Sequence, residues 1–90
     1  MKICRAYRTR AGRWGFTFYK DELSVSGIIS SGESALACAM CILDIPGQYF
    51  VREMRVREFA SLTKNWSYAG DSANDIANWI KKALRAKRKK

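Results

Sequence analysis

The sequence predicts a single α+β domain with an antiparallel sheet of three or four strands, a buried helix on one face of that sheet, and a C-terminal amphipathic helix. The chain has 90 residues, a length that suits one small hydrophobic core. Residues 2–30 alternate apolar and polar side chains with a period of two, which is typical of strands with one buried face. Residues 73–84 instead repeat apolar side chains at helical spacing. The expected order of elements is β-β-β-α-β-α.

Three consecutive strands are predicted at residues 2–10, 13–20 and 22–30, joined by short turns. The three aromatic residues at even-numbered positions of the second strand fall on one face, which we expect to be the buried, inner face. The opposite, outer face would display Arg5, Tyr7, Arg13, Thr17, Tyr19, Ser24 and Ser26.

A helix is predicted next, at residues 35–43. Ser30 or Ser31 would cap its N-terminus, and the Ile-Pro-Gly sequence at 45–47 would end it. The segment is apolar on every side, so the helix is expected to be buried against the aromatic face of the sheet. Its Cys38-Ala39-Met40-Cys41 motif would then supply small core thiols. A redox pair needs a helix N-terminus, and a zinc site needs more cysteine or histidine than this chain has.

Residues 48–63 fit two interpretations. Phe50, Met54 and Val56 follow the alternation of a strand, whereas residues 51–58 also contain good helix formers. We favour a fourth strand, because a Pro-Gly pair followed by Tyr-Phe-Val is typical of a turn that leads into a strand.

The last element is an amphipathic helix over residues 73–84, capped by Asp71 or Ser72. Acidic side chains at its start and basic ones at its end match the helix macrodipole. Residues 1–86 would form one domain, and residues 87–90 a frayed basic tail.

The composition excludes several classes of function. Lys and Arg total 17 against 8 Asp and Glu, which gives a net charge of +9 with no histidine. A Ser-His-Asp triad and a His-ligated metal are therefore excluded. The carboxylates lie between arginines or at helix starts and form no acid–base pair, so we expect no catalysis, no cofactor and no metal. The longest apolar run, residues 35–43, is too short to span a membrane, and the N-terminus lacks the apolar run of a signal peptide, which favours a cytoplasmic protein with no membrane partner.

Positive charge is concentrated toward both ends of the chain. Residues 1–20 carry six basic side chains and no acidic one, and residues 71–90 carry seven basic and two acidic side chains. Arginine interleaved with tyrosine on a sheet suits contact with phosphates and bases. A solvated strand face and a helix end that complements its own dipole are the structural alternatives. The candidate nucleic-acid-binding residues are Arg5, Tyr7, Arg8, Arg10, Arg13, Tyr19, Lys81, Lys82, Arg85, Lys87 and Arg88.

Three short motifs carry a resemblance to known domains: Tyr7-Arg8, Arg13-Trp14-Gly15 and the run Glu33-Ser34-Ala35-Leu36-Ala37. With them, residues 5–43 resemble the sheet-plus-helix DNA-binding domains of the AP2 type and of integrase arm-binding domains. The resemblance implies a sheet laid in the DNA major groove. Its DNA-facing residues would be Arg5, Arg8, Arg10 and Arg13.

The pattern departs from that family in the third strand, where Ser24 and Ser26 stand at positions expected to be basic, and residues 48–90 have no counterpart. The same part of the chain is also similar to the partial RNase H-like fold of HicB-type antitoxins. In both, an aromatic strand leads through a segment like residues 27–33 into an alanine-rich helix.

The sequence thus predicts a small, basic, non-catalytic nucleic-acid-binding protein, with DNA favoured over RNA and little sequence preference. Neutralising about five phosphates would give a salt slope near −4 to −5 on duplex DNA. The alternative is a protein-binding inhibitor or antitoxin of phage or mobile-element type. Such a protein would use the same basic face to block an acidic surface of a host nucleic-acid-processing complex. The sequence contains no signal for the oligomeric state.

Overall fold

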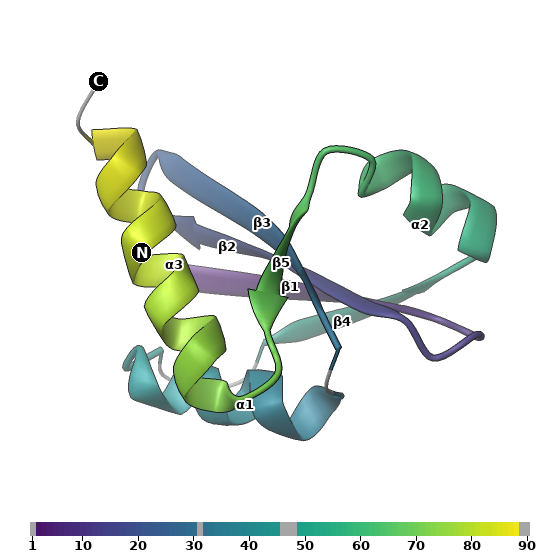
Figure 1. The fold of residues 1–90 in the computed structure, drawn as a ribbon, viewed down its shortest axis with the longest axis horizontal. Coiled ribbons are helices and arrows are strands. Elements are labelled where there is room, and N and C mark those ends of the chain that lie inside the picture. The colour runs from purple at the N-terminus through teal and green to yellow at the C-terminus, as the bar shows by residue number, and fades with distance from the viewer. Residues whose placement is uncertain (1, 31, 46–48, 89–90) are drawn as a thin grey trace.

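The computed structural model describes residues 2–30, 32–45 and 49–88, which form an α+β fold (Figure 1). The predicted class is confirmed, but the sheet has five strands and mixes parallel with antiparallel pairs. The strand order across the sheet is β4-β1-β2-β3-β5. Along the chain the elements are β1 (Lys2–Thr9), β2 (Trp14–Lys20), β3 (Leu23–Ile29), α1 (Glu33–Ile42), β4 (Phe50–Met54), α2 (Val56–Leu62), β5 (Ser67–Gly70) and α3 (Ala73–Arg88).

The first three strands form the antiparallel meander that the alternation predicts. Cys4 pairs with Phe18 and Phe18 with Val25, so these three side chains share the inner face of the sheet. Gly12 lies in the β1–β2 turn with a φ of 84°, a conformation that glycine adopts without strain. The register of both pairs therefore separates inner from outer residues as the period-two pattern predicts.

The fourth strand predicted over residues 48–63 is wrong in extent. Residue 48 lies outside the described residues, and the rest divides into β4, which runs parallel to β1, and the short helix α2. A further strand, β5, then pairs in parallel with the opposite edge of the meander, against β3. Parallel pairs join segments that are distant in sequence, so local alternation carries no information about them. Residues 56–62 become helical because Phe59, now 1% exposed, packs onto the sheet.

Helices α1 and α3 cover the inner face, as Figure 1 shows. The prediction that the first helix packs against the aromatic face is confirmed, since Leu36, Ala39 and Met40 join the cluster around Phe16 and Phe18. The prediction that the whole helix is buried is wrong. In this two-layer fold one side of α1 faces solvent.

The two cysteines of α1 lie on that solvent side, so the expectation of small core thiols at Cys38 and Cys41 is also wrong. Serine capping of α1 does not occur as predicted either. Gly32 stands at the N-cap without a side-chain hydrogen bond, and Ser30 instead donates to Asp71 at the start of α3. Ser31 lies outside the described residues. The helix ends at Ile42, and of the predicted stop at 45–47 only Ile45 is described.

The amphipathic C-terminal helix is confirmed, and Ser72 provides its cap. The Ser72 hydroxyl accepts a hydrogen bond from the backbone N–H of Asp75 at 3.1 Å, while Asp71 is used by the hydroxyls of Ser30 and Tyr68. The helix continues to Arg88, beyond residue 86 where fraying was expected, and the last two residues of that predicted tail lie outside the described residues. Within the described chain, no helix has both the length and the apolar character needed to cross a membrane.

Helix α2 covers one end of the outer face. Phe59 packs there with Tyr7, Met54 and the half-buried Trp66. The ring centroids of Tyr7 and Trp66 are 5.6 Å apart, and those of Phe59 and Trp66 are 6.4 Å apart. The rest of the outer face has no helix over it among the described elements (Figure 1).

Candidate functional site

The structure brings together two of the candidate residues on the outer face. The Arg5 guanidinium carbon lies 5.7 Å from the ring centroid of Tyr19, a cation–π arrangement on neighbouring strands. Tyr7 is on the same face but is only 8% exposed, because the aromatic cluster beneath α2 covers it. Tyr7, a predicted nucleic-acid contact, is therefore part of the packing that holds α2, and little of its side chain faces solvent.

The three arginines around the β1–β2 turn do not share one surface. Arg8 pairs in register with Trp14, an inner-face residue, and its guanidinium lies over the indole ring at 5.7 Å. Arg13 lies on the other face, over the ring of Phe59. Arg10, in the turn between them, is almost fully exposed. Arg8, one of the predicted DNA-facing residues, therefore lies on the opposite side of the sheet from Arg5.

The basic residues of α3 are separated from Arg5 by the sheet itself, because α3 packs on the inner face. Lys87 donates a hydrogen bond to the backbone carbonyl of Ser24 at the start of β3. The structure thus divides the predicted surface into an outer-face region and a helix end on the inner side. The candidates on that helix end are Lys81, Lys82, Arg85, Lys87 and Arg88, all exposed.

Four residues absent from the sequence-based candidates lie on β4 or where β4 leads into α2. The parallel pairing of β4 with β1 sets Phe50 next to Arg5 and Arg52 next to Tyr7 on the outer face. Phe50 is 68% exposed. Arg55 and Arg57 follow at the junction of β4 and α2. The sequence contains three arginines in this segment, but only the long-range pairing of β4 with β1 places Arg52 on the same face as Arg5.

These residues line three depressions that adjoin along β4 and α2. The first, about 320 Å³, is lined by Arg5, Phe50 and Arg52 among others. The second, about 510 Å³, shares Arg52 with the first and adds Arg55 and Arg57. The third, about 630 Å³, shares Arg55 with the second and reaches Arg10 in the β1–β2 turn. We call these three neighbouring depressions together the arginine groove, defined by Arg5, Arg10, Arg52, Arg55 and Arg57.

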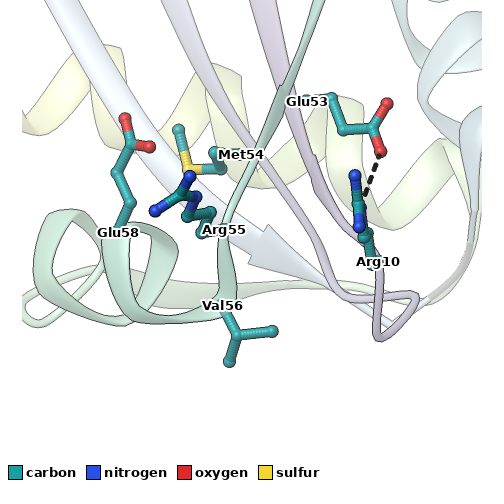
Figure 2. A pocket seen from close by; sticks show the side chains of 6 residues that line it. All are labelled: Arg10, Glu53, Met54, Arg55, Val56 and Glu58. Carbon is teal, nitrogen blue, oxygen red and sulfur yellow. Dashed lines mark ion pairs between the residues drawn. The ribbon is translucent and has the colours of Figure 1, made fainter.

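Two glutamates hold part of the groove in place. Glu53 accepts Arg8 at 3.5 Å and Arg10 at 3.9 Å, and Glu58 pairs with Arg52 at 2.6 Å. Figure 2 shows the third depression, with Arg10 and Glu53 on one side and Arg55 and Glu58 on the other. Five arginines thus line the groove beside two carboxylates, and the groove keeps a positive charge.

Arg55 and Arg57 have no carboxylate within ion-pair distance among the residues described, so their guanidinium groups are available to a ligand. Guanidinium donors bind phosphate in a fork geometry, which gives both affinity and orientation. The groove therefore combines arginines held by a carboxylate, Arg10 and Arg52, with arginines that have no such partner among the described residues. Several guanidinium groups spread over neighbouring depressions suit an extended polyanion better than a single small anion.

The groups with chemical reactivity lie elsewhere. Burial raises the pKa of the Cys4 thiol to about 12, so this thiol stays protonated at neutral pH. In the described ranges, no three side chains of His, Cys, Asp or Glu type gather closely enough to hold a metal ion. Comparison of the chain with protein-family models, with curated proteins and with solved structures finds no match. The function is therefore inferred from the groove itself.

Proposed function

We propose that this chain is a small, non-catalytic nucleic-acid-binding protein whose contact surface is the arginine groove. The observation that carries the proposal is that five arginines, from β1, the β1–β2 turn, β4 and α2, line three neighbouring depressions. These residues are up to 52 positions apart in the sequence, between Arg5 and Arg57, and the fold gathers them on neighbouring elements. A phosphate backbone is a biological polyanion that such a group of guanidinium side chains matches.

The proposed contacts are to phosphates, so binding depends strongly on salt and weakly on sequence. If all five groove arginines neutralise a phosphate, the slope of log affinity against log salt is between about −3 and −5. The basic end of α3 adds to the overall positive potential and speeds encounter, but it lies on the other side of the sheet. This gives the two basic regions unequal roles.

A matched pair of double variants tests this division. Arg55→Gln with Arg57→Gln removes two charges from the groove, and Arg85→Gln with Arg88→Gln removes two from α3. Fluorescence anisotropy with labelled DNA and RNA, between about 50 and 300 mM salt, gives the affinity and the salt slope of each variant. The groove variant is expected to lose about tenfold or more in affinity near 150 mM salt, and to flatten the slope by about 1.5.

The α3 variant is expected to lose less than about threefold, since its charges act only through the long-range potential. An equal loss in both variants would show that total charge explains the binding, and the groove would then not be the site. Absence of binding near 150 mM salt by the wild-type protein would remove the proposal altogether.

One observation favours a second candidate, a protein-binding inhibitor that covers an acidic surface of a nucleic-acid-processing complex. Exposed apolar side chains accompany the groove, namely Phe50, Val51, Val56 and Leu62. Apolar groups rimmed by charge are common in protein interfaces. This candidate is expected to survive removal of nucleic acid by nuclease and to be lost on Leu62→Glu, measured by size-exclusion chromatography with a purified partner complex.

A further inference from the structure

From the part of the groove between β1 and β4, we infer that the nucleic acid bound there is single-stranded, with an unpaired base stacked on Phe50. This inference rests on the proposed function and names the form of nucleic acid that the groove takes. Phe50 is the most exposed large apolar side chain of the described residues, at 68%. A phenylalanine on the outer face of a sheet with this exposure contributes little to the core, and its ring is open to a ligand.

The surroundings of Phe50 give the ring its proposed role. Arg5 is its direct neighbour on β1, and neighbouring strands are about 4.8 Å apart, so the two side chains lie side by side. Arg52 projects from the same strand and the same face, two residues further along. A base stacked on Phe50 therefore has the Arg5 guanidinium to its side and the Arg52 side chain along the strand. In the proposed complex a flanking phosphate binds Arg5, or shares the Arg52 guanidinium with Glu58.

Arg5 is itself oriented by Tyr19, whose ring lies beneath its guanidinium. The outer face thus presents a row of flat groups running from Phe50 on β4 through Arg5 on β1 to Tyr19 on β2. Aromatic rings and stacked guanidinium planes on a sheet suit unpaired bases, because every base has a π face while the bases of a duplex are already stacked.

The shape of the region also disfavours a duplex. The arginines line depressions, whereas reading a duplex requires a helix or ribbon that protrudes into its major groove. Four side chains of α2 line the second depression, so the helix forms one wall of it: Arg57, Glu58, Ser61 and Leu62. A flexible single strand is able to follow this wall from Phe50 past Arg52 toward Arg57.

The test compares a labelled oligo(dT) of about 12 nucleotides with a duplex of about 12 base pairs, on wild type and three variants, near 150 mM salt. Phe50→Ala removes the ring, Phe50→Trp replaces it with a larger one, and Ile42→Ala is the matched control. Ile42 is an exposed apolar residue, at 44%, at the end of α1, which packs on the inner face, and it lines none of the three depressions.

We expect wild type to bind oligo(dT) at least about tenfold more tightly than the duplex. Phe50→Ala is expected to weaken oligo(dT) binding about 5- to 100-fold and to leave duplex binding unchanged. Phe50→Trp restores the affinity, and Ile42→Ala leaves it unchanged. Circular dichroism of each variant confirms that the fold is intact.

Two results overturn the inference in distinguishable ways. If the duplex binds as tightly as oligo(dT) and Phe50→Ala changes neither, while Arg55→Gln with Arg57→Gln still weakens both, the groove binds nucleic acid and only the single-strand inference fails. If neither probe binds wild type near 150 mM salt, the proposed function fails and the inference fails with it.

Discussion

On the inner face of the sheet, one apolar cluster joins β1, β2 and β3 to the two helices α1 and α3. On the outer face, the buried cluster consists of Tyr7, Met54 and Phe59, with Trp66 packed against them. The inner face is covered by helices α1 and α3, whose apolar residues are recognisable in the sequence. The outer face is covered at one end by the seven-residue helix α2, and elsewhere it exposes arginines and Phe50. The larger apolar cluster is thus on the inner face, and the outer face carries the smaller cluster together with the arginines of the proposed site.

If the arginine groove is the binding surface, as proposed, then the density of charge along the chain is a poor guide to such a surface. The basic end of α3 has the densest run of lysine and arginine, yet its side chains are exposed on a helix surface that faces solvent. The groove arginines come from four separate segments, and several are fixed by an aromatic ring or a carboxylate. Such fixing lowers the entropy that is lost on binding.

The largest effect on stability is expected when the side chain that packs α2 onto the outer face is removed. Phe59→Ala leaves a cavity under α2 and is expected to lower the free energy of unfolding by about 3–5 kcal/mol, measured by urea denaturation. Leu62→Ala, on the exposed side of the same helix, is expected to change it by less than about 0.5 kcal/mol. A small loss in Phe59→Ala would show that α2 is held by something other than this ring.

A smaller disturbance at the same place comes from Gly15→Ala. The added Cβ would lie 2.8 Å from the Trp66 ring and 3.2 Å from the Phe59 ring, so both rings have to move. Overpacking of this kind is expected to cost about 1–3 kcal/mol in thermal or urea unfolding, together with a weaker affinity of the groove. Gly32→Ala is the control, because nothing lies within 4 Å of its Cβ position, and its cost is expected to stay below about 1 kcal/mol. Equal costs at the two sites would contradict the packing described for α2.

The pH dependence of the free energy of unfolding tests how completely the inner face is buried. Burial raises the pKa of the Cys4 thiol from 9.0 to about 12, so in that range the folded chain keeps a proton that the unfolded chain loses. The free energy of unfolding therefore falls as pH rises above about 9, by about 1.4 kcal/mol per pH unit from this group. Urea denaturation between about pH 8 and 11 is expected to show a steeper fall in wild type than in Cys4→Ala. Parallel curves for the two proteins would show that Cys4 is not desolvated.

The smallest effect is expected at the cap of α3. Ser72→Ala removes the acceptor for the Asp75 N–H and is expected to cost about 1 kcal/mol, while Ser72→Asp retains most of the stability. Because α3 lies on the inner side, neither variant is expected to change the affinity for a nucleic-acid probe. A change in affinity that follows the stability of α3 would show that the two faces are coupled.

Much of the inner half of the fold was predictable because its signals are local. The alternation in residues 2–30 places Cys4, Phe16 and Phe18 on one face, and the helical spacing from Ala73 to Leu84 gives the buried stripe of α3. Part of the candidate site was predictable for the same reason. Arg5 and Tyr19 are on neighbouring strands of a meander, so their shared face follows from the period of a strand.

By itself, then, the sequence determined the α+β class, the meander, the C-terminal helix, and the excess of positive charge. Only the tertiary structure decided that β4 pairs in parallel with β1, that Phe59 seats α2 over Tyr7, and that Phe50 and Arg52 lie beside Arg5. The physical reason is that period and propensity act over a few neighbouring residues. Parallel pairing and the burial of Phe59 instead depend on contacts between segments some 45–50 positions apart, which exist only once the chain has folded.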